Sequence, residues 1–251
     1  MEIHHQHHHD HPQHKEKVWK HYALEFFMLF LAVFCGFLAE NFREHQIEHQ
    51  REKEYMISLV EDLNEDIETL NHQIVTEGRK LLQMDSLINF LNNKPNPDQL
   101  GRIYYIARMA SRHDIFNYNN RTIDQMRNSG AFRLVRNKEI SSQIVEYYRQ
   151  IKLLEMLEGI EKEEEHEYRR GAIKVFDPVV FNVIVSNEKD SVTVPVGNPP
   201  LRTQDHNVLA DLAGWTQYVK SSVLGMTKYK TELKKSAEEL TSSIKKAYHL
   251  E

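Results

Sequence analysis

The sequence predicts a mainly α-helical membrane protein, in which one N-terminal transmembrane helix continues into a helical-bundle or coiled-coil-like extramembrane domain. Three observations lead to this prediction. Residues 26–39 form an unbroken run of apolar or small side chains. Long segments after this run carry apolar residues at every third or fourth position, as helices that bury one face do. Only 9 Gly and 7 Pro occur in 251 residues, so few points in the chain interrupt a helix.

The apolar run reaches a membrane-spanning length once its flanks are included. Trp19 and Tyr22 precede it, as aromatic residues do at a membrane interface, and Glu25 is the one charged residue between Tyr22 and Ala39. A helix over residues 22–41 is about 30 Å long, which matches the hydrocarbon thickness of a bilayer. We therefore predict a transmembrane helix at 22–41.

A cleaved signal peptide and the buried helix of a soluble protein are the alternatives for this run. Cleavage after Ala39 would place Phe37 where a small residue is needed, and Cys35 follows Phe34 rather than the small residue of a lipoprotein signal. A helix in a soluble protein is normally apolar on one face, whereas Phe and Leu surround this one. The transmembrane interpretation is therefore preferred.

The segments before and after the span are predicted to lie on opposite sides of an inner membrane. Residues 1–21 are expected to form a His-rich, disordered cytoplasmic tail, and residues 42–251 a helical periplasmic domain. The basic residues nearest the span slightly favour the N-terminal side as the cytoplasmic one. They are Lys15, Lys17 and Lys20 before the span, and Arg43, Arg51 and Lys53 after it.

One face of the predicted span carries an acid together with small residues. At about 100° per residue, the side chains of this face fall within roughly 60° of one another. They are Glu25, Ala32, Gly36 and Ala39. Small residues at this spacing let a second helix approach closely, so we expect packing against a second copy or another membrane protein. Two other interpretations of Glu25 stay open, namely that it reaches the lipid headgroups or that it takes part in proton transfer.

Histidines are concentrated in the first 21 residues. Imidazole clusters bind Zn, Ni and Cu ions, and Asp10 offers an oxygen ligand. The segment lacks the apolar residues that would build a rigid site. We therefore expect no cofactor beyond weak or adventitious metal binding, with a physiological metal-sensing role as the alternative. The candidate ligands are His4, His5, His7, His8, His9, His11 and His14.

Apolar stripes and loop residues divide the extramembrane part into helices. A long helix near 44–91 is predicted to end before Pro95 and Pro97. A short helix that includes Ile123 ends at Gly130, because glycine suits the left-handed position after a helix. A third helix begins after Asn137, a residue that caps helix N-termini well.

The last third of the chain is predicted to change character and then to return to helix. Residues 179–196 hold two β-branched runs with turn-type residues between them, so they form a small hairpin, or the first run is a helix end. A long helix near 205–248 is expected to pair antiparallel with the helix near 44–91. Its apolar seam is Leu212, Trp215, Val219, Val223, Met226, Leu233, Ala237, Leu240 and Ile244.

Composition and motifs exclude several classes of function. The formal net charge is −5, which provides no general attraction for nucleic acid. Cys35 is the only cysteine, which excludes a disulfide or a Cys-based zinc site within the chain. No phosphate-binding loop and no metalloprotease or serine-hydrolase motif occurs, so we predict a protein that is not an enzyme. The charged run at 161–170 is interpreted as a solvated helix face. The arginines between 102 and 136 are interpreted first as partners of the acidic helix near 44–91, with anionic lipid headgroups or an acidic partner molecule as the alternatives.

Three segments carry a resemblance to a known family: YALEFFMLFLAVFCGFLAENFRE at 22–44, YMISLVEDLNEDI at 55–67 and RTIDQMRNSGAFRLVRNKEISSQIVEYY at 121–148. They resemble the bacterial family catalogued as domain of unknown function 6090. That family pairs a membrane helix bearing a Glu with a T-I-x-x-hydrophobic-x-x-S-G helix end and a later Y-Y. The matching residues here are Glu25, Thr122, Ile123, Met126, Ser129, Gly130, Tyr147 and Tyr148. Met126 stands where leucine is usual, and Ala32 where glycine is expected. The resemblance implies an envelope protein without an assigned activity.

The function that these features favour is that of a non-enzymatic, single-pass interaction or scaffold protein of the bacterial envelope. It is expected to contact membrane lipid and to assemble as a homo-oligomer or with another membrane protein. One alternative is an accessory or stator-like subunit of a proton-driven membrane complex that uses Glu25. Another is a metal-responsive signalling protein that uses the histidine tail.

Overall fold

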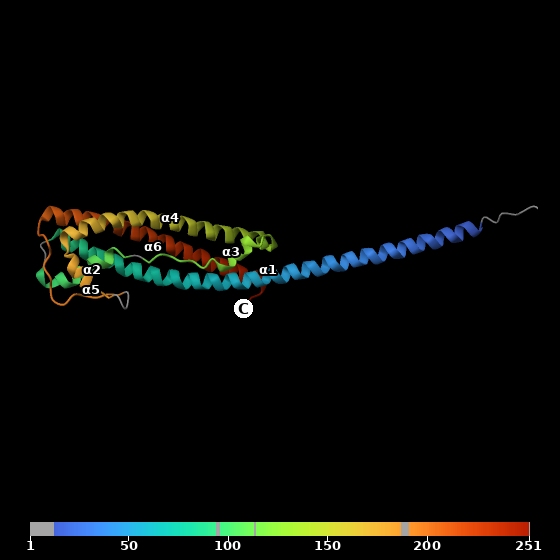
Figure 1. The fold of residues 1–251 in the computed structure, drawn as a ribbon, viewed down its shortest axis with the longest axis horizontal. Helices are drawn as coiled ribbons and strands as arrows, with labels where there is room; N and C mark the ends of the chain where they lie inside the picture. The colour runs from blue at the N-terminus through green and yellow to red at the C-terminus, as the bar shows by residue number, and fades with distance from the viewer. Residues whose placement is uncertain (1–12, 94–95, 113, 187–190, 251) are drawn as a thin grey trace, which may run out of the picture. The chain divides into compact units, whose positions relative to one another are not determined.

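The computed structural model describes residues 13–93, 96–112, 114–186 and 191–250 of the chain. The predicted mainly α-helical fold is confirmed in these residues (Figure 1). The helices are α1 (Gln13–Asn92), α2 (Leu100–Ala110), α3 (Arg121–Asn128), α4 (Lys138–Val175), α5 (Pro178–Ile184) and α6 (His206–Tyr248). Two 3-10 turns, η1 (Pro97–Gln99) and η2 (Ala131–Leu134), and two short strands, β1 (Val185–Ser186) and β2 (Ser191–Val192), complete the described elements.

The chain forms two compact units, residues 1–54 and 55–251, and α1 runs through the boundary without a break. In the first unit α1 exposes its large apolar side chains on every side; Phe26, for example, is 75% exposed. This helix is long and apolar enough to cross a membrane. The helix α1 already begins at Gln13. Residues 13–21 are therefore helical, whereas the sequence predicted that they belong to a disordered tail. The Lys- and Glu-containing sequence after Pro12 suits a helix, which explains the early start.

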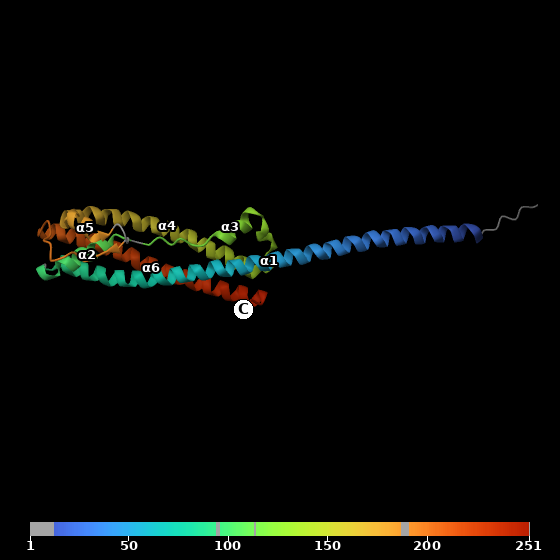
Figure 2. The same cartoon turned by 60° about the horizontal axis from the view of Figure 1, so that its bottom comes forward.

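The second unit is a bundle of three long helices, formed by residues 55–92 of α1 with α4 and α6 (Figures 1 and 2). Contacts between α1 and α6 run in opposite directions along the two helices. Lys220 contacts Asp85, Lys230 contacts Glu77, and Lys234 contacts Asn71. The predicted antiparallel pairing of these two helices is therefore confirmed, and α4 adds a third helix of comparable length.

The apolar core of the bundle consists of two clusters. The first cluster lies around Leu63 of α1, Tyr147 of α4 and Leu240 of α6. The second lies around Leu87 of α1 and also contains residues of α2. On α1 and α4 a largely polar stretch separates the parts that belong to the two clusters, whereas on α6 the first cluster begins at Met226, directly after Val223 of the second. The predicted seam of α6 is buried except for Trp215, which is 37% exposed, and Thr216 takes the buried position next to it.

Two buried aspartates of α1 hold the segment that precedes α4. Asp62 accepts hydrogen bonds from the backbone N–H of Thr122, at 2.9 Å, and from the guanidinium of Arg121, at 2.7 Å. It therefore caps the N-terminus of α3 from another helix, since the N-cap residue Asn120 makes no side-chain cap of its own. Asp66 accepts hydrogen bonds from the backbone N–H of Asn119 and the hydroxyl of Tyr147, both at 2.7 Å.

The helix ends follow the predicted signals at two places. Asn137 caps α4 by accepting hydrogen bonds from the backbone N–H groups of Glu139 and Ile140. Gly130, with a φ of 69°, takes the left-handed conformation after α3 that favours glycine.

The predicted hairpin exists but is smaller than residues 179–196. Asp177 accepts a hydrogen bond from the backbone N–H of Val179, and Pro178 occupies the first helical position, so this run begins as the helix α5. The two antiparallel strands contain only two residues each, with Val185 opposite Val192. Local capping therefore overrides the β-branched composition of the first run.

Replacing Asp62 tests its role as a cap supplied by another helix. Asp62→Ala leaves the backbone N–H of Thr122 buried without an acceptor, and we expect it to lower the free energy of unfolding by about 2–3 kcal/mol. Glu61→Ala, at an exposed neighbouring position, should change it by less than about 0.5 kcal/mol. Denaturant unfolding of the detergent-solubilised protein, followed by circular dichroism, measures both values. Equal effects of the two substitutions would contradict the capping role.

The buried carboxyl group of Asp66 predicts how the stability of the bundle depends on pH. Burial raises the pKa of Asp66 from its ordinary value of 3.8 to about 6, although Tyr147 and Asn119 donate hydrogen bonds to it. The folded state thus binds a proton more tightly than the unfolded state. This contribution to stability is complete below pH 4 and is lost as the pH rises through 6.

Asp66→Asn keeps the shape of the side chain and removes this titration. We expect the stability of the natural protein relative to this variant to fall by about 2 kcal/mol between pH 4.5 and pH 8. Urea unfolding at a series of pH values measures the difference. Asp211→Asn, at an exposed position of α6, is the control and should show no such trend. The same slope for both variants would refute the assignment to Asp66.

Candidate functional site

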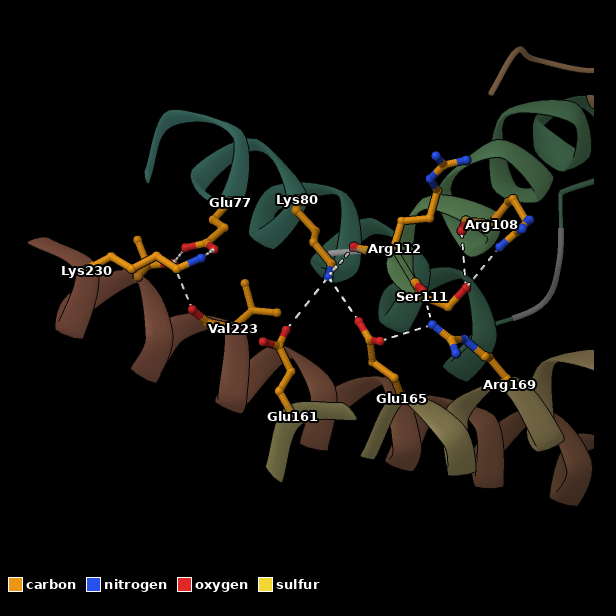
Figure 3. Close-up of polar contacts among 11 residues, drawn as sticks. Glu77, Lys80, Arg108, Ser111, Arg112, Glu161, Glu165, Arg169, Val223 and Lys230 are labelled. Carbon is orange, nitrogen blue, oxygen red and sulfur yellow. Dashed lines mark hydrogen bonds and ion pairs between the residues drawn. The ribbon is translucent and has the colours of Figure 1, made fainter. Parts of the chain in front are cut away.

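The most unusual feature of the bundle is a layer of charged side chains between the two apolar clusters (Figure 3). We call it the charged layer, and its side chains come from all three long helices. They are Glu77 and Lys80 of α1, Glu161, Glu165 and Arg169 of α4, and Lys230 of α6. The side chains of Glu165 and Lys230 are 0% and 2% exposed, so these charges require partners inside the protein.

Lys80 lies at the centre of the charged layer. Its ammonium group donates a hydrogen bond to the carbonyl oxygen of Arg112, at 2.8 Å. The same nitrogen lies 3.7 Å from Oε1 of Glu165 and 4.0 Å from Oε1 of Glu161. Burial lowers the pKa of Lys80, while the two carboxylates favour its charged form. One cation thus joins two acids of α4 to the chain that follows α2.

Arg169 makes a parallel connection one turn further along α4. Its guanidinium donates to the carbonyl oxygen of Ser111, at 2.6 Å, and to Oε2 of Glu165, at 3.1 Å. Ser111 and Arg112 follow α2 directly, where carbonyl groups lack partners within the helix. Lys80 and Arg169 supply positive donors at this end, which the helix dipole favours. The charged layer therefore caps the C-terminus of α2.

A second pair in the charged layer joins α1 to α6. Oε1 of Glu77 lies 2.5 Å from the ammonium nitrogen of Lys230, and Oε2 accepts a hydrogen bond from the hydroxyl of Thr227, at 2.9 Å. The same hydroxyl lies 2.7 Å from the carbonyl oxygen of Val223. Because both oxygens of Glu77 are used, the pair sets the position of α6 along α1.

A polar pocket of about 290 Å³ adjoins the charged layer. Its lining includes Gln73, whose side chain donates to the carbonyl oxygen of Ile115, at 3.2 Å, while its own buried oxygen has no hydrogen-bond partner. The pocket lies just below the size range of common small-molecule sites. Acids and bases in the layer occur as neutralising pairs. This arrangement suits the positioning of helices.

The sequence did not single out the charged layer, and the interpretation of residues 161–170 as a solvated face is wrong for three of them. Glu161, Glu165 and Tyr168 are buried, whereas Lys162 and Arg170 are exposed. The three buried residues continue the three- and four-residue spacing of the apolar stripe before them. This spacing was the signal in the sequence that could have predicted the burial of Glu161 and Glu165 despite their charges.

Among the residues that the structure describes, no other helix covers the predicted membrane face. Glu25, Ala32, Gly36 and Ala39 are all exposed, and the space where a side chain would extend from Gly36 is open. Oε1 of Glu25 lies 3.5 Å from Nε2 of His21, one turn earlier on the same helix. The packing role of this face stays a prediction.

Most of the predicted metal ligands lie outside the described residues. This applies to His4, His5, His7, His8, His9 and His11, and His14 lies at the start of α1 without a described side chain. Among the side chains that the structure describes, no group of three or more His, Cys, Asp or Glu residues is arranged to hold a metal ion.

Some of the residues that carry the family resemblance lie in or beside the first apolar cluster, whereas Glu25 lies in the first unit and Ser129 and Gly130 are exposed. Ile123, Tyr147 and Tyr148 belong to that cluster, and Thr122 is buried beside Asp62. The hydroxyl of Ser129 donates to the carbonyl oxygen of Gln125, at 2.7 Å, which closes α3. The predicted contact between the arginines and the acidic helix is found in Arg121, which pairs with Asp62. These residues therefore build the fold around α3.

The charged layer predicts a large effect for removal of its central cation. Lys80→Met leaves Glu161 and Glu165 with less positive charge and the carbonyl oxygen of Arg112 without its donor. We expect the free energy of unfolding to fall by about 3 kcal/mol. Lys162→Met, an exposed lysine of α4, is the matched control and should have an effect below about 0.5 kcal/mol.

A second substitution makes the test specific for the charge. Glu165→Gln added to Lys80→Met should recover part of the lost stability, because it removes one buried carboxylate. Guanidinium unfolding of Lys80→Met, of Glu165→Gln and of the double variant, each compared with the natural protein, gives the coupling free energy between the two side chains. Strictly additive losses would show that Lys80 does not act through Glu165.

Comparisons with protein-family models, with curated proteins and with solved structures found no match for this chain, so the family resemblance stays an expectation and the geometry carries the functional argument.

Proposed function

We propose that this chain is a single-pass, membrane-anchored interaction or scaffold protein of the bacterial envelope that performs no catalysis. One observation carries the proposal: the apolar segment of the first unit has no cover from the described chain. All of its large side chains between Trp19 and Phe42 are exposed. So large an exposed apolar surface is unfavourable in water, and a lipid bilayer removes it.

The flanks of the segment support a span with defined ends. Glu40 and Arg43 form a paired charge at its C-terminal end, with Arg43 Nη2 2.6 Å from Glu40 Oε1. Trp19 and Tyr22 stand at the other end, where an interfacial aromatic belt is expected. The basic residues before Tyr22 support a cytoplasmic N-terminus and a periplasmic bundle.

The interaction role rests on one surface available to partners and on the fixed register of the bundle. In the membrane, the face of Ala32 and Gly36 admits a second helix, from another copy or from another membrane protein. Glu25 lies near one end of the span beside His21, which suits a carboxylate that reaches the headgroups. Outside the membrane, the charged layer holds the bundle in one register, as a scaffold requires.

The native Cys35 provides the test. It lies six residues from the end of the predicted span, about 9 Å inside it, and it is exposed in the isolated chain. In isolated membranes Cys35 should not react with a membrane-impermeant maleimide, and it should react fully once the membranes are dissolved in a denaturing detergent. A gel shift with a polyethylene-glycol maleimide measures the labelled fraction.

A reporter cysteine in the bundle serves as the matched control. Cys35→Ser combined with Ser242→Cys, at an exposed position of α6, should be labelled in cells whose outer membrane has been permeabilised. Labelling only in inside-out vesicles would reverse the proposed orientation. Equal labelling of Cys35 and the reporter in intact membranes would exclude the span.

A further inference from the structure

A second cleft, distinct from the pocket beside Lys80, lies between α2, α4 and α5. Its volume is about 420 Å³, within the range of small-molecule sites. Its apolar walls are Ala107, Ala172, Ile173, Pro178, Phe181 and Val185. Phe181 packs against the rings of Tyr104 and Phe176, at centroid distances of 5.7 and 5.6 Å, which fixes the α5 side of the cleft.

The polar lining of the cleft includes Arg108, a half-buried residue of α2. Its guanidinium makes one hydrogen bond, to the hydroxyl of Ser111, at 3.3 Å (Figure 3). In the part of the chain that the structure describes, no carboxylate lies within ion-pair distance of Arg108. Arg169, which also lines the cleft, differs in this respect because it is paired with Glu165.

Arg108 is not needed to cap α2, although it lies in the last turn. The carbonyl oxygen of Ala107 accepts from the hydroxyl of Tyr168, at 2.7 Å, and that of Arg108 itself accepts from the hydroxyl of Ser111. The carbonyl oxygens of Ser111 and Arg112 are taken by Arg169 and Lys80. The guanidinium therefore keeps donors that no group of the helix end requires.

The electrostatic surroundings of Arg108 favour an incoming negative charge. Burial lowers the pKa of its guanidinium, and the positive charges of Arg112 and Arg169 lower it further. A bound anion would offset both effects. Because the carboxylate of Glu165 already neutralises Arg169, the cleft has one unneutralised arginine, and a single negative charge balances it.

We propose that this cleft binds a small amphiphilic monoanion, a carboxylate joined to a compact apolar body. The carboxylate accepts hydrogen bonds from the guanidinium of Arg108, a donor geometry that matches a planar carboxylate. The apolar body lies against Ile173 and Phe181. The exposed amide of Asn182 at the edge of the cleft adds a polar contact for the head group. This inference does not depend on the orientation of the chain in a membrane.

The probe for the test is 4-phenylbutyrate, with the uncharged 4-phenyl-1-butanol as its matched compound. The full-length protein is held in nanodiscs of zwitterionic lipid, and equilibrium dialysis measures binding. We expect saturable 1:1 binding of the carboxylate and binding of the alcohol at least tenfold weaker. Empty nanodiscs give the partition of each compound into lipid, which is subtracted.

Two arginine variants of α2 make the test specific to the cleft. Arg108→Gln should raise the dissociation constant of 4-phenylbutyrate at least tenfold. Arg102→Gln, at an exposed position of the same helix outside the cleft, should leave it unchanged. Circular dichroism confirms that each variant is folded, and Arg108→Lys, which keeps the charge, should bind more tightly than Arg108→Gln.

The proposal is overturned by any of three results. These are no saturable binding to the natural protein, equal binding of the carboxylate and the alcohol, and an equal loss of binding in Arg102→Gln and Arg108→Gln. Failure of this test would leave the membrane-anchor proposal intact, because Cys35 labelling reads a different part of the chain.

Discussion

The buried carboxylate of Glu165 is the constraint around which the bundle is organised. A charge with no solvent exposure is strongly unfavourable unless cations and donors surround it. Lys80 of α1 and Arg169 of α4 provide the positive charge that Glu165 needs, from two sides. The same two cations donate hydrogen bonds to the carbonyl oxygens of Arg112 and Ser111, which follow α2. Through them, Glu165 also determines where α2 ends. The helices α1 and α4 and the short α2 are thereby positioned through a single network, and the Glu77–Lys230 pair adds α6.

This network also explains how three long helices adopt one register. The two apolar clusters on either side of the charged layer contain similar aliphatic and aromatic residues, and apolar packing alone tolerates sliding by a turn. A slide by one turn would separate Glu77 from Lys230 and leave the buried ammonium group of Lys230 without this partner. The cost of an unpaired buried charge excludes such arrangements, as polar residues do in coiled coils.

At both ends of the bundle, side chains of other helices bind the backbone groups that a helix end leaves without partners. Near α3, Asp62 and Asp66 of α1 provide acceptors for backbone N–H groups at the start of a helix. Beyond α2, Lys80 and Arg169 provide donors for carbonyl groups at the end of a helix. In each case the side chain matches the sign of the helix dipole. The guanidinium of Arg108 caps no helix end and pairs with no carboxylate among the described residues, which is why its surroundings point to a ligand.

The sequence by itself determined the elements that depend on local signals. Apolar spacing predicted the long helices, Asn137 and Gly130 marked helix ends through their own backbone preferences, and the run from Phe26 to Ala39 predicted a helix apolar on all sides. Only the tertiary structure decided which charges are buried. Glu165 belongs to a run of charged residues typical of a solvated helix face. Its burial follows from its two cationic partners, Lys80, which lies 85 residues earlier, and Arg169, which also binds the carbonyl oxygen of Ser111. Such pairing depends on distances between helices, and local sequence spacing does not encode those distances.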